Sequence, residues 1–250
     1  MKIKKIVISG ANEYTEIDSL LRLMSKYPKA EIGIQVSATK AYESSARYWW
    51  INALYYALQA TKEDVSVALH INTNWVENFG EGLVAPEIEN WLNFCPLNNG
   101  EPFIKRVQLN FKVGRERKPS TVALRYAMSK FPNQRFIIPY NKENAKVVKE
   151  MHKYGIDFDC LYDGSSGEAV LPKERLKPVF NENVLQGYAG GISAENVYAE
   201  LNKISKVVPK DREIFIDAEG KLKGLDRHLS LDYAEEYLRC ATLWDKKHNG

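Results

Sequence analysis

The chain has 250 residues, of which 44% are hydrophobic and 27% charged, a composition typical of a globular protein with a sizeable core. Its 35 basic and 32 acidic residues nearly balance, which argues against nucleic-acid or membrane-surface binding. The three cysteines are far apart with no CxxC pair, so they suggest neither a disulfide framework nor a zinc site, and no apolar run approaches the roughly 20 residues of a membrane span. The apolar run near the start is too short for a signal peptide. We therefore expect a cytoplasmic protein with no metal, cofactor, nucleic-acid or membrane partner.

Strand and helix signals alternate along the chain. Eight short runs rich in Val, Ile, Phe and Tyr predict strands, at residues 5–9, 31–37, 65–71, 103–111, 134–140, 158–162, 183–189 and 213–217. Segments with apolar residues at helical spacing lie between them, around Leu21, Leu54, Val148 and Leu201. Weaker helical segments cover 86–92 and 172–178, and a last helix over 230–244 has Ser230 as its cap.

Eight strand–helix units in this length predict an α/β fold, a (β/α)8 TIM barrel that forms a single domain over residues 1–250. An open doubly wound sheet is the alternative. It is less favoured because no glycine-rich dinucleotide fingerprint follows the first strand.

Alternation of side chains along the predicted strands points a polar set into the barrel. This set converges near the carboxyl-terminal mouth, where barrel enzymes carry out chemistry, and consists of Ser9, Gln35, His70, Asn110 and Asp163. Each residue also has a structural interpretation: a buried amide can satisfy its neighbours, a single histidine can be structural, and Asp163 can be a turn residue.

Small-residue turns follow three of the last predicted strands. They contain Gly164, Ser165, Ser166 and Gly167, then Gly190 and Gly191 before a helix that begins near Ala194, and Gly220. Glycines let backbone N–H groups approach an anion, and a helix N-terminus adds free donors, so the turns predict a phosphate site. Ordinary tight turns are the alternative.

These motifs together resemble phosphoribosylanthranilate isomerase, a TIM barrel of the ribulose-phosphate-binding type from tryptophan biosynthesis. "AGGISAENV" (189–197) is similar to the family's Ala-Gly-Gly-Leu-x-Pro-Glu-Asn-Val and is the most specific match. "ISG" (8–10), "VQLN" (107–110), "DGSSG" (163–167) and "DAEG" (217–220) resemble further family motifs in the same order. The correspondence runs from the first strand to the last.

The resemblance implies a general acid at Asp163, with Asp159 as the alternative, and a general base at the position of Ser9. The family has cysteine where this chain has Ser9 and histidine where it has Asn110. A serine hydroxyl is too weak an acid to replace a thiolate without an activating partner, so His70 and Glu219 are candidate substitute bases. The remaining mouth residues would bind substrate: Gln35, Gln108, Asp217 and Glu219.

Two functions agree with this pattern. The first is a sugar-phosphate isomerase, of the intramolecular aldose–ketose type, or a lyase, with a phosphorylated sugar or sugar amine as ligand. The second is a non-catalytic phosphometabolite binder that kept the phosphate site and lost the base.

Two further segments carry expectations. The helix over 48–59 has aromatics beyond its core stripe, with Trp49 and Tyr56 lying off it, which indicates either a broad core face or a homodimer surface. The long connection 72–86 is expected to be a mobile lid in which Trp75 and Phe79 exclude water, with a rigid, packed loop as the alternative.

Overall fold

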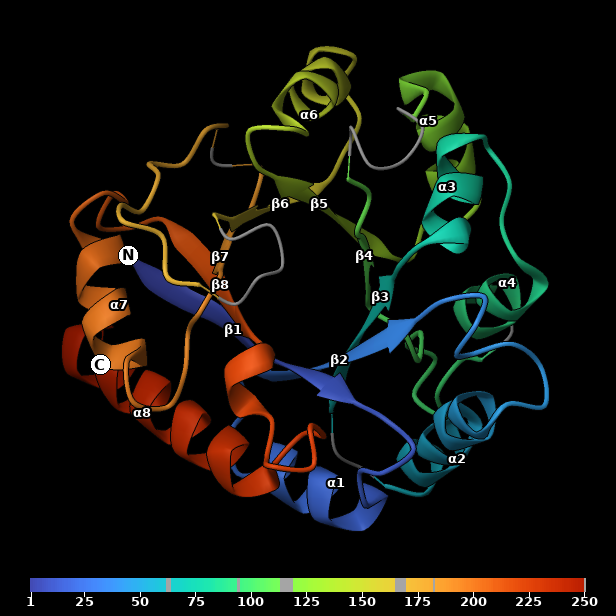
Figure 1. Cartoon of the computed structure of the whole chain (residues 1–250), viewed down its shortest axis with the longest axis horizontal. Helices are drawn as coiled ribbons and strands as arrows, with labels where there is room; N and C mark the ends of the chain where they lie inside the picture. The colour runs from blue at the N-terminus through green and yellow to red at the C-terminus, as the bar shows by residue number, and fades with distance from the viewer. Residues whose placement is uncertain (62–63, 94, 113–118, 165–169, 182, 250) are drawn as a thin grey trace. The chain divides into compact units, whose positions relative to one another are not determined.

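Eight parallel strands follow one another in chain order around a closed barrel (Figure 1). The structure is a computed structural model, and it describes residues 1–61, 64–93, 95–112, 119–164, 170–181 and 183–249. The strands are β1 (Lys2–Ala11), β2 (Ala30–Val36), β3 (Ser66–Ile71), β4 (Arg106–Leu109), β5 (Arg135–Tyr140), β6 (Asp159–Asp163), β7 (Gln186–Ala189) and β8 (Glu213–Ala218). The predicted TIM barrel is confirmed, and the open doubly wound sheet is excluded.

Helices connect most of the strands. They are α1 (Ile17–Ser25), α2 (Ala46–Ala60), α3 (Asn74–Gly80), α4 (Pro86–Asn93), α5 (Thr121–Ser129), α6 (Ala145–Lys153), α7 (Val197–Ser205), a 3-10 turn η1 (Gly220–Leu222) and α8 (Leu231–Asn249). Within the part of the chain that the structure describes, no helix is both long enough and apolar enough to cross a membrane.

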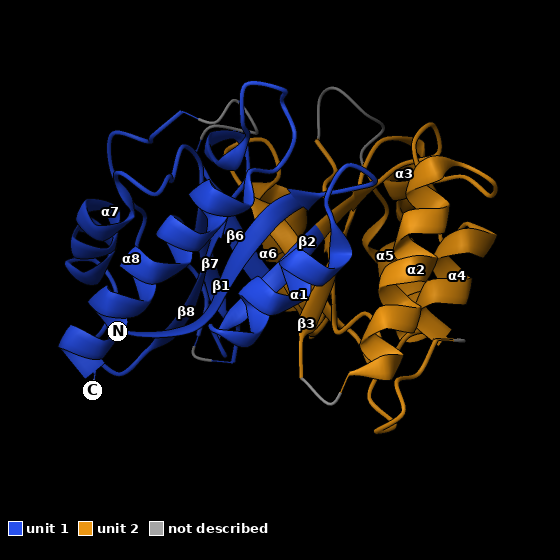
Figure 2. Cartoon of the chain, turned by 90° about the horizontal axis from the view of Figure 1, so that it is seen from below, with its two compact units in different colours: residues 1–33, 160–250 blue, residues 34–159 orange. Residues whose placement is uncertain are grey.

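The chain divides into two compact units, coloured separately in Figure 2. Unit 1 contains residues 1–33 and 160–250, and unit 2 contains residues 34–159. The single domain over residues 1–250, which we expected from the eight strand–helix units, stays a prediction.

Unit 1 is built on β1 and on the run of strands from β6 to β8. β1 pairs with β8 from Lys2 opposite Glu213 to Ile8 opposite Ala218, and β7 lies between β6 and β8. Gly187 on β7 is required by packing, since a Cβ there would lie 2.1 Å from Cζ of Phe215 on β8. The helix α8 packs on α7 and β1 and completes the core of this unit.

In unit 2, three charged residues mark the amino-terminal ends of their strands. Arg106 begins β4, Arg135 begins β5 and Asp159 begins β6. The Asp159 carboxylate lies 2.7 Å from Nε of Arg135 and 3.7 Å from Nη2 of Arg106, and it is buried. Asp159 thus belongs to an ion-pair cluster at the amino-terminal ends of these strands, which in this fold serve stability rather than chemistry.

The helix predicted over 172–178 is wrong. No helix occurs among the residues described between β6 and β7. Pro172 and Pro178 bracket a segment too short for a stable helix, and the residue before a proline avoids the helical conformation. The segment runs instead over the carboxyl-terminal end of β7, where Arg175 is buried.

The connection 72–86 is also different from the lid that we expected. Its residues Asn74–Gly80 form the helix α3, and the side chains of Trp75 and Phe79 are buried. The Phe79 ring packs against Phe131 and Phe136. These aromatic side chains are packed in a core and are not available to cover a ligand. This agrees with the alternative for the segment, a rigid and packed connection.

The aromatic helix α2 presents two large side chains to solvent. Trp50, Leu54 and Leu58 are buried on its core face, whereas Trp49 is 60% exposed and Tyr56 is 69% exposed. The aromatic residues of α2 thus extend beyond its buried face. A homodimer formed through the exposed Trp49 and Tyr56 stays a prediction.

Candidate functional site

A serine–aspartate pair joins the carboxyl-terminal parts of the neighbouring strands β1 and β8 in unit 1. Ser9 Oγ donates a hydrogen bond of 2.6 Å to Oδ1 of Asp217. Both residues are buried, Ser9 at 1% exposure and Asp217 at 7%. Ser9, which we expected at the base position, therefore has a partner that can influence its chemistry.

Burial raises the pKa of Asp217 to about 7, against the Ser9 hydrogen bond, which lowers it. Three further carboxylates, Glu219, Glu31 and Asp163, raise the pKa of Asp217 by repulsion. Carboxyl groups tuned to neutral pH are typical of sites that transfer protons. The sequence placed Asp217 only among substrate-binding residues, because its neighbours become visible only in the folded strands.

Asp163 ends β6, whereas Asp159 begins it. In the β6–β7 ladder, Asp163 stands opposite Ala189, the residue before Gly190. Of the two candidate acids, Asp163 therefore has the position at the carboxyl-terminal end of its strand, next to the glycine turn. The adjacent Gly164 packs against Pro172 and Tyr162, while Ser165, Ser166 and Gly167 lie outside the described residues.

Two successive glycines with left-handed backbone lie between β7 and α7. The φ angle is 85° at Gly190 and 67° at Gly191, a region that glycine occupies without steric cost. Asn196 fixes the turn, since its Nδ2 donates to the Gly191 carbonyl and its Oδ1 accepts from the Ser193 N–H, both at 2.9 Å. Backbone N–H groups in such turns form concave sites that suit anions. The turn is longer than expected, because α7 begins at Val197 rather than near Ala194.

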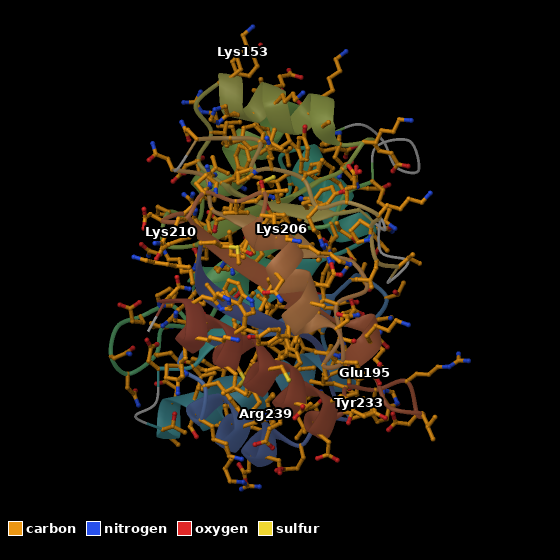
Figure 3. The ribbon with its side chains drawn as sticks, turned by 90° about the vertical axis from the view of Figure 1, so that its left-hand side faces the viewer. Lys153, Glu195, Lys206, Lys210, Tyr233 and Arg239 are labelled. Carbon is orange, nitrogen blue, oxygen red and sulfur yellow. The ribbon has the colours of Figure 1, made fainter. Side chains whose placement is uncertain are left out.

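The charges around α7 complement its dipole. Glu195 precedes the helix and Lys206 follows it, at opposite ends of the helix in Figure 3. Glu195 is exposed and therefore well screened by solvent, so it leaves the amino-terminal end of α7 compatible with a bound anion.

A buried arginine that the sequence did not reveal contacts the backbone at the start of the glycine turn. Arg175 donates from Nη1 to the Ala189 carbonyl at 2.6 Å and forms an ion pair with Glu200 on α7, with Nη2 and Oε2 at 2.7 Å. The Arg175 and Glu200 side chains are 1% and 2% exposed, and Lys203 also contacts Glu200. Arg175 thus joins the β6–β7 connection, the end of β7 and α7, and its only signal in the sequence was a charged residue in a segment misread as a helix.

The third turn lies after β8. Gly220 begins η1, and Glu219 forms an ion pair of 2.8 Å with Lys223. A Cβ at Gly10, which has a φ of 104°, would approach both Glu219 and Lys223, so the β1 and β8 connections lie side by side. Because Glu219 is already paired with a cation, it is a weaker candidate for the substitute base than Asp217.

Unit 2 carries a separate polar cluster on β3, β4 and the residues that follow them. Gln108 donates to Asn110 at 2.8 Å, Asn110 donates to Asn72 at 3.1 Å, and Asn72 donates to the carbonyl of His70 at 2.9 Å. The chain of amides fixes Asn110 and leaves it no acid–base role of its own, since amides do not titrate in this range. Gln35, on β2, is half-buried, and its carbonyl accepts from Arg47 at 2.7 Å.

His70 is fully buried beside this cluster. Burial, assisted by the positive charge of Arg106, lowers the pKa of His70 to about 3. No hydrogen bond to Nε2 of His70 is present within the described part of the chain. An imidazole this hard to protonate is a poor general base near pH 7, so the site chemistry favours Asp217 over His70.

Comparison with known proteins supports the fold. A phosphoribosylanthranilate isomerase from Thermus thermophilus is similar over 96% of this chain and 98% of its own, with 15% identity and a TM-score of 0.58. A phosphoribosylanthranilate isomerase in complex with reduced 1-(O-carboxyphenylamino)-1-deoxyribulose 5-phosphate covers 96% and 99% with 14% identity and a TM-score of 0.55. A native KDPGal structure covers 99% and 97% with 10% identity and a TM-score of 0.55.

The chain thus has a phosphoribosylanthranilate isomerase-like (β/α)8 barrel. No family model matches the sequence, and no curated protein matches it. At identities this low the likeness defines the fold, and function must be argued from the site.

Proposed function

We propose that this protein binds the phosphate of a phosphorylated sugar or sugar amine at the β7–α7 turn of unit 1 and isomerises or cleaves that ligand. The observation that carries the proposal is the pair of left-handed glycines, Gly190 and Gly191, that precedes α7. Their backbone can approach an anion closely, and the free donors at a helix N-terminus favour negative charge.

The acidic residues nearby supply the chemistry. Asp163 is the proposed general acid, because it ends β6 next to the turn and is near enough to Asp217 to affect that group's charge. A sugar held by its phosphate would extend from the turn toward these carboxyl groups. The ligand in the Amadori-type reaction of the resembling family is of this kind, a phosphoribosyl amine.

A non-catalytic binder is the second candidate, and one observation favours it: a serine stands at the position of the family's thiol. The two candidates differ in turnover and agree in binding. Binding must therefore be tested first.

We expect ribose 5-phosphate and reduced 1-(O-carboxyphenylamino)-1-deoxyribulose 5-phosphate to raise the melting temperature and to give a measurable heat of binding, whereas ribose does not. Gly190→Asp should weaken binding at least about 100-fold. The reason is electrostatic repulsion: a carboxylate and one negative charge of the phosphate, about 4 Å apart, repel each other by about 4 kcal/mol at an effective dielectric constant of 20.

Gly190→Asn is the matched control, because asparagine tolerates the left-handed backbone as well as aspartate does and adds no charge. It should keep most of the wild-type affinity. Equal affinity of the Asp and Asn variants for ribose 5-phosphate would show that the phosphate does not bind at this turn. A wild-type protein that binds no sugar phosphate would overturn the proposed function.

A further inference from the structure

Ser9 and Asp217 form a pair that neither the resemblance nor the fold explains. A serine hydroxyl, here near the carboxyl-terminal end of β1, is too weakly acidic to act as a base near neutral pH unless a partner changes its properties. The structure provides such a partner on the neighbouring strand, since Ser9 Oγ donates to Oδ1 of Asp217 at 2.6 Å. The direction of this hydrogen bond makes the carboxylate, and not the hydroxyl, the group that can accept a proton.

The surroundings of Asp217 let its carboxyl group change protonation state near neutral pH. Burial raises the pKa of Tyr237 on α8, and the charge of Asp217 raises it further. The groups that act on Asp217 itself come from several elements of unit 1: Ser9 on β1, Glu31 on β2, Asp163 on β6 and Glu219 after β8. All the charged members of this set are acidic, so repulsion adds to burial and raises the pKa of Asp217. The Ser9 hydrogen bond opposes both effects and keeps part of the carboxyl ionised near pH 7.

We propose that Asp217 is the general base of this site and that Ser9 positions its carboxylate for proton transfer from the carbon next to the carbonyl or imine of a phosphorylated aldose or aldosylamine. This inference rests on the proposed function, because the phosphate turn must bring the sugar to the pair. Within the described residues no hydrogen bond engages Oδ2 of Asp217, so that oxygen is available for the transfer.

The proposed step balances without another reactant. The C2–H proton moves to the Asp217 carboxylate, and the C–H electron pair forms a C1=C2 double bond. The former C1 π electrons go to the carbonyl oxygen or imine nitrogen, and the Asp163 carboxylate passes the 2-hydroxyl proton to that atom. Asp217 then returns its proton to C1 as the ketose carbonyl forms at C2, so both carboxylates end as they began.

The position of Asp217 supports this role. One residue earlier in the β7–β8 ladder, Tyr188 stands opposite Ile216, so the strands bring Asp217 to the level of Ala189. Ala189 in turn stands opposite Asp163 on β6. The proposed base and acid therefore occupy one level of the sheet, on strands that flank the one leading into the glycine turn.

The first test needs no ligand. In protein labelled with 13C at the aspartate carboxyls, the resonance lost in Asp217→Asn should titrate near pH 7, and Ser9→Ala should move its midpoint upward, because the opposing hydrogen bond is lost. Ser9→Thr keeps a hydroxyl and should restore the midpoint. A titration midpoint near 4 in the wild-type protein, or a midpoint unchanged by Ser9→Ala, would contradict the proposed roles of Asp217 and Ser9.

The second test measures proton transfer. Ribose 5-phosphate in D2O should lose its C2–H signal in the presence of the wild-type protein, with a rate that rises through the midpoint found by titration. Asp217→Asn should slow the exchange by about 10²–10⁴-fold, the usual contribution of a general base, with affinity changed by less than about threefold. Glu213→Gln alters an exposed carboxylate at the other end of β8, paired with Lys4, and should leave the exchange unchanged.

The outcomes separate this inference from the function on which it rests. Binding without C2–H exchange, or exchange that survives in Asp217→Asn, would overturn Asp217 as the base and leave the phosphate site intact. Failure to bind ribose 5-phosphate would overturn the proposed function itself, whatever the titration of Asp217 gives.

Discussion

At the scale of single residues, burial acts in opposite directions on two titratable groups. It raises the pKa of Asp217 to about 7 and lowers the pKa of His70 to about 3, because in each case it disfavours the charged form. Asp217 can therefore gain and lose a proton near neutral pH, whereas His70 stays neutral there. The effect of burial on the pKa thus distinguishes the two candidate bases, Asp217 and His70, and residue type alone does not reveal it.

The raised pKa of Asp217 predicts a pH-dependent stability. The folded state holds this proton more tightly than the unfolded chain, whose ordinary value is 3.8, so the free energy of unfolding falls as pH rises from about 4 to about 7. Asp217→Asn removes this loss. Relative to wild type, the variant should gain on the order of 2–3 kcal/mol between pH 5 and pH 8, measured by urea unfolding.

Glu213→Gln is the control for this measurement too, because that exposed carboxylate should leave the pH dependence of wild type unchanged. Parallel stability curves for Asp217→Asn and wild type between pH 5 and pH 8 would show that Asp217 titrates normally.

Sequence patterns identified the individual residues of this pair but not their contact. The motif match singled out the positions of Ser9 and Asp217 separately. They are 208 residues apart in the chain, and their hydrogen bond depends on the register between β1 and β8. Register between the first and last strands is a long-range property of the fold, which local propensity does not contain.

At the scale of secondary structure, the alternation of strands and helices was predictable because buried strands and amphipathic helices have distinct periods. The α3 helix and the helix-free β6–β7 connection were not. In α3 the aromatic side chains pack inward on residues distant in sequence, and after β6 the buried Arg175 organises the connection. Both depend on tertiary contacts that override weak local preference.

Arg175 gives a prediction at this scale. Arg175→Met leaves Glu200 buried with Lys203 as its one remaining cation partner among the described residues, and should cost about 3–5 kcal/mol in the free energy of unfolding. It also removes the hydrogen bond to the Ala189 carbonyl, so the affinity for ribose 5-phosphate should fall together with the melting temperature.

The double variant Arg175→Met/Glu200→Leu separates the two effects. Replacing both charges by apolar side chains should restore much of the stability but not the support of the glycine turn. Weak ribose 5-phosphate binding in a stable double variant is the expected result. Wild-type affinity in that variant would limit Arg175 to a stabilising role.

At the scale of the whole molecule, the order of the strands determines how the units are connected. Unit 1 is formed by the two ends of the chain, residues 1–33 and 160–250, and unit 2 is the continuous segment between them. β1 and β8, the first and last strands, pair within unit 1. The proposed proton-transfer pair therefore depends on bringing both ends of the chain together.

This connectivity predicts cooperative unfolding of all 250 residues, as expected for one domain. If unit 2 unfolded first, it would become a long flexible loop closing unit 1, at an entropic cost of about 4 kcal/mol by the usual logarithmic scaling with loop length. Opening a closed barrel would also leave strands with unpaired edges. Native-state hydrogen exchange, followed by mass spectrometry in increasing urea, should therefore give the same free energy of opening, within about 1 kcal/mol, for peptides covering β8 and β4. Protection that disappears from β4 at a distinctly lower urea concentration than from β8 would show that the two units unfold as separate domains.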